Sequence, residues 1–266
     1  MTTNEVLVPG EAQVSGPLLF ARYAYPPNEL GYCGPDDASA LIDSATQDGG
    51  INDVRHLARQ FEGAWPYLEL IARCNGITDP LDRRVVEAYW VGNDLAHHVP
   101  ALSLATSLDD RFSRRTARDF EPLVSAAFTG GVVQHSFHVF AVYPWLGMLR
   151  AGKEGAPLEV LDRCRIRWGR VVEVHGDFLT VKSRALRFEG SRLTLGDEGV
   201  EVVRAARRGV GFVDDLMPGD TVSLHWDWVC DRLSQRSLQW LQRCTRMNLL
   251  AVNRLARPGP ATVCGT

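Results

Sequence analysis

The chain has 266 residues, of which 45% are hydrophobic and 23% are charged, and its formal net charge is -3. This balance is typical of globular proteins and gives no electrostatic basis for binding nucleic acid or an acidic membrane surface. No apolar run is long enough to span a bilayer, and the first ten residues lack the pattern of a signal peptide. We therefore expect a cytoplasmic protein with no nucleic-acid or membrane partner.

Residues 15–150 are predicted to form a helical domain. Gly34-Pro35, followed by acidic residues, is typical of a helix start. Further helices are expected over 52–74, which Pro66 bends or splits, from Asp79 through His98, over 113–128 and over 134–150, with an interruption at Pro144.

Residues 151–158 have the composition of a connector, and residues 158–256 are predicted to form a second domain. Alternating segments predict five strands over 164–174, 178–188, 191–195, 199–206 and 221–229. Five short strands in so few residues favour a small, OB-like β-barrel, which leaves few exposed sheet edges. A helix from Ser234 to about Arg257 follows. The predicted fold class is α+β.

Six cysteines are present, and no two of them form a C-x-x-C pair. Structural zinc spacing is therefore absent, and most of the thiols are expected to be buried. One or two are candidates for reactive thiolates or metal ligands. The cysteines are Cys33, Cys74, Cys164, Cys230, Cys244 and Cys264.

Two motifs lie at the ends of the predicted barrel. Cys164 is followed by Gly169 and Val171, and the sequence Pro-Gly-Asp at 218–220 precedes His225. The order of these elements resembles the HypC/HupF family of nickel–iron hydrogenase maturation chaperones, which start with Cys, Gly and Val and carry Pro-Gly-Asp ahead of a His. The chain departs from that pattern at 167–168, at 227 and in having the Cys inside the chain.

The resemblance implies an accessory protein that binds or delivers an iron centre with cyanide and carbonyl ligands. Cys164 would be the thiolate ligand of the iron, and His225 a second ligand or a proton partner. Both ligands would face a surface opening, and Trp226 and Trp228 would flank it and dock against the partner. That partner would be the hydrogenase large subunit or another maturation protein.

The helical part contains a second choice of metal ligands. Cys33 precedes the predicted helix start, where the helix dipole favours a thiolate. His135 and His138 are spaced i, i+3 on one helix face and are suited to iron, haem or zinc. The alternative is that both histidines are buried and hydrogen-bonded and that Cys33 only packs. The stretches Y-x-x-P, G-Y-C-G-P and H-x-F-H-V-F resemble those of an uncharacterised family and imply no function.

Three functions remain open from the sequence. The first is the hydrogenase accessory protein. The second is a metal- or haem-dependent enzyme, whose helical domain does redox or ligand-forming chemistry and whose barrel is a docking module. The third is a structural adaptor. Nucleotide hydrolysis, dinucleotide redox chemistry and serine hydrolysis are disfavoured, because their motifs are absent.

Overall fold

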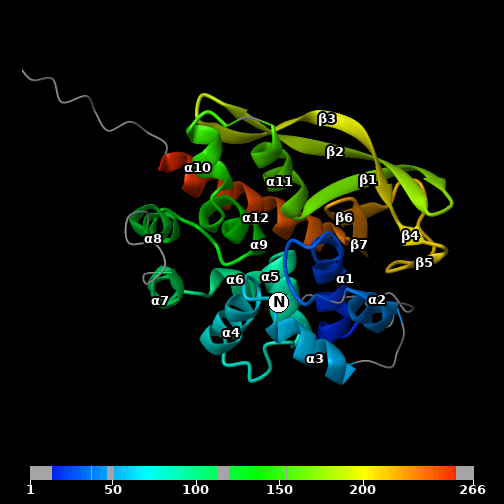
Figure 1. Cartoon of the computed structure of the whole chain (residues 1–266), viewed down its shortest axis with the longest axis horizontal. Coiled ribbons are helices and arrows are strands. Elements are labelled where there is room, and N and C mark those ends of the chain that lie inside the picture. Colours follow the sequence, from blue (N-terminus) through cyan, green and yellow to red (C-terminus); the bar gives the residue numbers. More distant parts are fainter. Residues whose placement is uncertain (1–13, 37, 47–50, 113–119, 154, 256–266) are drawn as a thin grey trace, which may run out of the picture.

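The computed structural model describes residues 14–36, 38–46, 51–112, 120–153 and 155–255, and its fold is α+β (Figure 1). A helical first part precedes the strands, and within the described ranges no strand comes before Arg167. The helices of the first part are α1 (Gly16–Glu29), α2 (Ser39–Thr46), α3 (Ile51–Arg59), α4 (Trp65–Cys74), α5 (Arg83–Trp90), α6 (Asp94–His97), α7 (Ala101–Phe112), α8 (Phe120–Phe128), α9 (His135–Phe137), the π-helix η1 (His138–Val142), α10 (Trp145–Arg150) and α11 (Ala156–Cys164).

The second part contains the sheet and the last helix. Its elements are β1 (Arg167–His175), β2 (Phe178–Glu189), β3 (Arg192–Arg204), β4 (Ala206–Arg207), β5 (Val210–Gly211), β6 (Thr221–His225), β7 (Trp228–Arg232) and α12 (Gln235–Arg254). Five strands form one sheet in the order β1-β2-β3-β7-β6, and β6 also pairs with β1. Only the link between β3 and β7, the single pair Arg204–Trp228, is parallel. In the described residues, no helix has the length and apolarity needed to cross a membrane.

The main sheet has five strands, as expected, but several of the predicted strand bounds are wrong. The predicted strands over 191–195 and 199–206 are one strand, β3, because pairing with β2 continues from Arg192 to Arg204. The segment 221–229 is two strands, since Trp226 has a φ of 56° and turns the chain between β6 and β7. Cys164 does not open a strand: the expected connector runs into α11, and Cys164 is the last residue of that helix.

The predicted helices also differ from the structure in detail. The segment 52–74 is split into α3 and α4, one of the two outcomes expected of Pro66, which lies in the first turn of α4, where proline fits. The segment from Asp79 to His98 is divided into α5 and α6, and the side chain of Asn93 caps α6 by accepting from Leu95 N.

The remaining predicted helices differ from the structure to varying degrees. The helix expected at Gly34-Pro35 begins only at Ser39, and α1 and α7 were not predicted. The segment 134–150 is interrupted before Trp145, as expected from Pro144. Residues 113–119 of the helix predicted over 113–128 lie outside the described residues.

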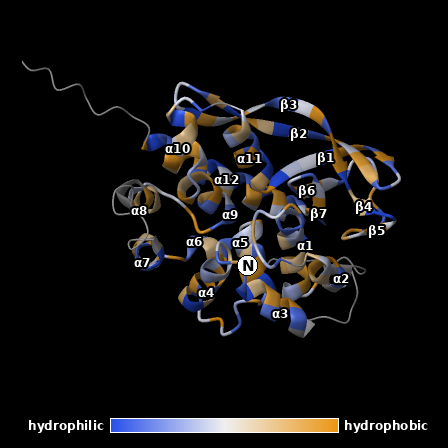
Figure 2. Cartoon of the chain, in the orientation of Figure 1, coloured by the Kyte–Doolittle hydropathy of each residue, from blue (hydrophilic) through white to orange (hydrophobic). Residues whose placement is uncertain are grey.

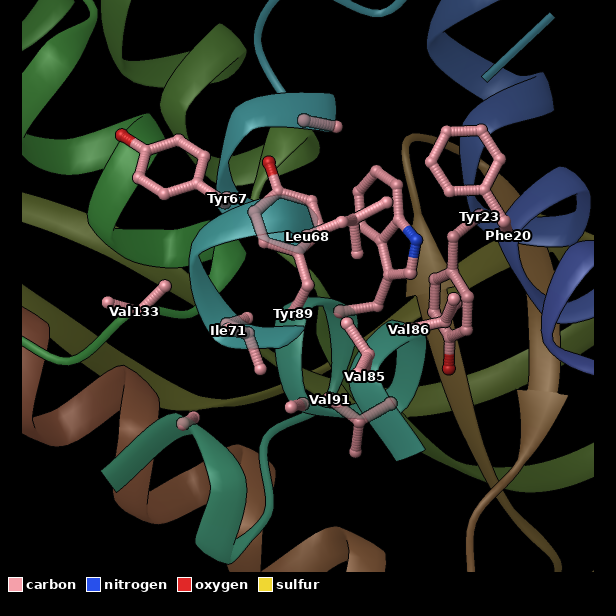
Figure 3. Close-up of a cluster of buried hydrophobic side chains, with 14 of the residues drawn as sticks. Phe20, Tyr23, Tyr67, Leu68, Ile71, Val85, Val86, Tyr89, Val91 and Val133 are labelled. Atoms are coloured by element: carbon pink, nitrogen blue, oxygen red, sulfur yellow. The ribbon is translucent and has the colours of Figure 1, made fainter. Parts of the chain in front are cut away.

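Helix α1 lies in the main hydrophobic core and joins the two parts of the chain. Its residues Phe20 and Tyr23 pack against α5, as Figure 3 shows, and the ring of Tyr23 stacks on Trp90 with centroids 5.6 Å apart. The Tyr23 hydroxyl forms a 2.7 Å hydrogen bond with Ser223 Oγ of β6. The same core includes Trp228 of β7. The division of the chain into 15–150 and 158–256 stays a prediction, because this core runs through both.

The β2–β3 hairpin extends past β1 and covers α11. Pairing of β1 with β2 stops at Ser183, and the hairpin continues to Glu189 and Arg192. Figure 2 shows hydrophobic and hydrophilic residues alternating along these strands, and the inward Leu186 and Leu193 share a core with Cys164. The hairpin therefore fixes the end of α11.

Asn253 of α12 fastens this hairpin. Its side chain accepts a 2.9 Å hydrogen bond from Leu193 N and donates a 2.7 Å hydrogen bond to Leu193 O. Helix α12 packs against the rest of the fold through the buried residues Leu241 and Val252.

We predict that Asn253→Ala lowers the free energy of unfolding by about 2–4 kcal/mol. The substitution leaves a buried N–H and a buried C=O of Leu193 without partners, at about 1–3 kcal/mol each. Urea denaturation followed by circular dichroism measures the change. Leu250→Ala on the exposed face of the same helix is the control and should cost no more than about 0.5 kcal/mol. Equal losses of unfolding free energy in the two variants would contradict the stabilising role of the two Asn253 hydrogen bonds.

Candidate metal centre

Three buried side chains with metal-binding atoms converge where the two parts of the chain meet. His135, Cys164 and His225 each offer one donor atom, and these atoms all lie within 4.8 Å of one another. His135 is the first residue of α9, Cys164 the last of α11 and His225 the last of β6. The structure thus brings together both ligands implied by the family resemblance and one of the second choice.

One ring nitrogen of His225 forms a hydrogen bond, and the other has no hydrogen-bond partner. Its Nδ1 lies 2.6 Å from the carbonyl oxygen of Tyr23. A carbonyl can only accept, so Nδ1 carries the hydrogen and Nε2 presents its lone pair. Nε2 is buried without a hydrogen-bond partner. Burial lowers the pKa of His225 to about 4, so the ring is neutral at pH 7.

The carbonyl of Tyr23 is available because of a proline. Tyr23 lies inside α1, where its carbonyl would normally accept from the N–H four residues later. That residue is Pro27, which has no N–H. The acceptor left open by Pro27 is the one that His225 uses, so the α1 backbone orients the imidazole.

His135 is held by two hydrogen bonds. Its Nε2 donates to the carbonyl oxygen of Cys164 at 2.9 Å, and its Nδ1 lies 3.1 Å from the Tyr89 hydroxyl. The Cys164 Sγ is 3.9 Å from the same Nε2. Because a hydroxyl both donates and accepts, Tyr89 fits either tautomer of the ring. Moving its proton to Nδ1 would free the Nε2 lone pair for an ion once the hydrogen bond to the Cys164 carbonyl is broken and that carbonyl turns away.

Cys164 is a neutral thiol in the absence of a nearby cation. Burial raises its pKa, and the charge of Cys33 acts in the same direction. A bound metal ion reverses this preference, since a coordinated thiol is deprotonated. One thiolate and two imidazoles form a donor set suited to iron, copper or zinc.

A cavity of about 130 Å³ adjoins the three ligands. All five candidate metal ligands from the sequence line it, as does Trp226. Its wall also includes the aromatic side chains of Tyr89, Trp90 and Tyr143. The five candidates are Cys33, His135, His138, Cys164 and His225.

His138 and Cys33 line the cavity outside the group of three. His138 Nδ1 is 3.3 Å from the hydroxyl of Tyr67, whose ring stacks on that of Tyr89 beside it in Figure 3, and burial lowers the His138 pKa to about 3. Cys33 is not at a helix start, and burial raises its pKa to about 12. The expected stabilisation of its thiolate by a helix dipole is therefore wrong.

The two tryptophans differ in position. Trp226 lies at the cavity and stacks on Tyr32, with centroids 4.3 Å apart. Trp228 is only 1% exposed, packs edge-on against Tyr25 and donates from Nε1 to Glu29. Contacts within the chain satisfy Trp228, whereas Nε1 of Trp226 is buried without a hydrogen-bond partner, and the partner-docking role of both stays a prediction.

The sequence analysis missed the residues that orient the ligands. Tyr23 and Tyr89 are needed for the ring orientations of His225 and His135, and α1 itself was not predicted. A usable signal was present in Pro27, since a proline near the end of a helix frees a carbonyl one turn earlier.

We predict that Pro27→Ala loosens His225. The new N–H competes for the Tyr23 carbonyl, so the Nδ1–H tautomer should give way to a mixture of tautomers. The ¹⁵N chemical shifts of the His225 ring report this directly. Pro26→Ala is the matched control, because it supplies a donor to the carbonyl of Arg22. Identical His225 spectra in the two variants would contradict the role of Pro27.

One protein family covers nearly the whole chain. The model of a family of unknown function, DUF6390, matches residues 12–258, which include both parts of the chain and every residue of the candidate metal centre. No curated protein and no solved structure matches the chain. The chain belongs to the DUF6390 family.

Proposed function

We propose that this chain binds an iron centre at Cys164, His225 and His135 and delivers it during assembly of a nickel–iron hydrogenase. The observation that carries the proposal is the buried, unpartnered Nε2 of His225, which lies with a thiol and a second imidazole beside a cavity. A buried polar atom without a partner is costly, and a bound ion would supply the missing partner.

The donor set supports iron as the cargo. A thiolate is a soft ligand, and together with imidazole it is suited to iron. The HypC/HupF resemblance implies that the residues at 164 and 225 carry the iron, and these two residues lie in the group of three. His135 adds a ligand from the helical part, which that resemblance does not imply.

The proposal also includes an OB-like barrel as the fold of the sheet and the cytoplasm as the location of the protein. The five-stranded sheet, in which β6 returns to pair with β1, is taken as an OB-like barrel of the kind the resemblance implies. The described cysteines are free, as thiols are in the reducing cytoplasm. The partner would be the hydrogenase large subunit or another maturation protein, and the cyanide and carbonyl ligands of the iron would occupy the adjoining cavity.

One feature favours a second candidate, a metal-dependent enzyme. Three protein ligands next to a cavity are the pattern of catalytic metal sites, which keep one coordination position open. Haem fits less well than an ion, because a cavity of about 130 Å³ is smaller than the ~300–1,000 Å³ of pockets for larger ligands. In this alternative the chain would bind a metal without cyanide or carbonyl and turn over a small substrate.

We predict that Cys164→Ala and His225→Ala each weaken ferrous iron binding by more than ~100-fold. Loss of an outer-shell partner alone costs about 10–100-fold, and these variants lose a ligand. Anaerobic equilibrium dialysis measures the affinity, and circular dichroism checks the fold. Cys74→Ala and His175→Ala, whose residues lie outside the group of three, should bind as the unaltered protein does. Iron affinity unchanged in Cys164→Ala would refute the site.

The same variants separate the two functions. Protein isolated anaerobically from a host that makes a nickel–iron hydrogenase should show infrared bands of bound cyanide and carbonyl, and Cys164→Ala should lack them. Deleting the gene in that host should lower hydrogenase activity, which the unaltered gene restores and the Cys164→Ala gene does not. A metal-loaded protein without these bands, in a host whose hydrogenase is unaffected by the deletion, would favour the enzyme.

A further inference from the structure

A second thiol lines the cavity that the three ligands adjoin. Cys33 belongs to the segment 31–35 between α1 and α2, and it is half-buried, whereas Cys164 is fully enclosed. The two thiols therefore face one cavity.

The segment 31–35 is placed across the cavity by specific contacts. The side-chain amide of Asn28 donates to the carbonyl oxygens of Cys33 at 2.8 Å and Pro35 at 2.6 Å. Gly34 has a φ of 89°, and a Cβ there would lie 2.3 Å from the ring of Phe61, so only glycine fits. Tyr32 covers Trp226 on the cavity wall.

Cys33 lies near the three ligands but outside their group. It lines the same cavity, but it is not in the group whose donor atoms lie within 4.8 Å of one another, so its sulfur has to approach to join them. The cavity can admit an ion, since one water needs only about 10–15 Å³ of such space.

We propose that Cys33 is a fourth protein ligand, which closes the coordination of an ion held by His135, Cys164 and His225. The inference rests on the proposed metal site and adds a second sulfur to it. The unpartnered Nε2 of His225 on the same cavity is the independent sign of a ligand there. Two thiolates and two imidazoles are a complete donor set for a four-coordinate ion that carries no cyanide or carbonyl.

The chemical step is a ligand exchange. The Cys33 thiol loses its proton to solvent, its sulfur forms a bond to the ion, and the water or other exogenous ligand on the ion leaves. Cys164 loses one proton in the same way, and the imidazoles, which are already neutral, release none. Binding of one divalent ion should therefore release about two protons from the protein, one from each thiol.

Cobalt(II) chloride, added anaerobically, tests this with two readouts. Each thiolate bound to cobalt adds sulfur-to-metal charge-transfer absorption in the near ultraviolet, and proton release is measured with an indicator in weak buffer. We expect Cys33→Ser to lower the absorption per bound cobalt by about half and to reduce the release from about two protons to about one. Cys74→Ser is the matched control and should change neither. Gly34→Ala, which displaces the segment and leaves every thiol in place, should act as Cys33→Ser does.

The outcomes distinguish the fourth ligand from the three-ligand site. Cys33→Ser and Gly34→Ala proteins that fold and give the absorption and proton release of the unaltered protein would overturn the role of Cys33. If Cys164→Ala abolishes cobalt binding in the same experiment, the three-ligand site stands and only the fourth ligand is lost. If Cys164→Ala binds cobalt as the unaltered protein does, the proposed function fails as well.

Discussion

The hydrogen bond from His225 Nδ1 to the Tyr23 carbonyl connects the site, the sheet and the first helix. It needs Pro27, which removes the helical N–H that would otherwise use this carbonyl. It also sets the tautomer that leaves Nε2 of His225 free to bind. The bond is buried where the two parts of the chain pack together, so the donor geometry of the site depends on that packing.

The burial of these groups has an energetic cost that a purely structural role would not explain. A neutral imidazole with one unpartnered nitrogen costs stability, and replacing it with an apolar side chain would avoid that cost. The low pKa of His138 and His225 and the raised pKa of Cys164 come from burial in each case. A bound cation stabilises such an arrangement, because it accepts the unused lone pairs and favours the thiolate form of Cys164.

The sequence predicted the types of secondary structure better than the residues at which they begin and end. The three candidate ligands lie at such ends. The α+β class, the number of main strands and the last helix followed from periodicity, and the grouping of Cys164 with His225 followed from a family resemblance. The position of Cys164 at the end of α11 did not follow, because a short helix and a short strand have similar apolar patterns. Neither did the role of Tyr23, which contributes a backbone carbonyl that any residue would supply.

The placement of the ligands at the ends of α9, α11 and β6 bears on how a site of this kind releases an ion. Residues at element ends have lost some of the backbone hydrogen bonds that fix a helix or strand interior, so small shifts of one element alter one ligand without unfolding it. His135 comes from the first part and His225 from the second, with Cys164 at the junction. In the proposed delivery, a partner that shifts one of these elements would remove one ligand, which would leave the ion with fewer bonds to this chain and more positions for the ligands of the acceptor.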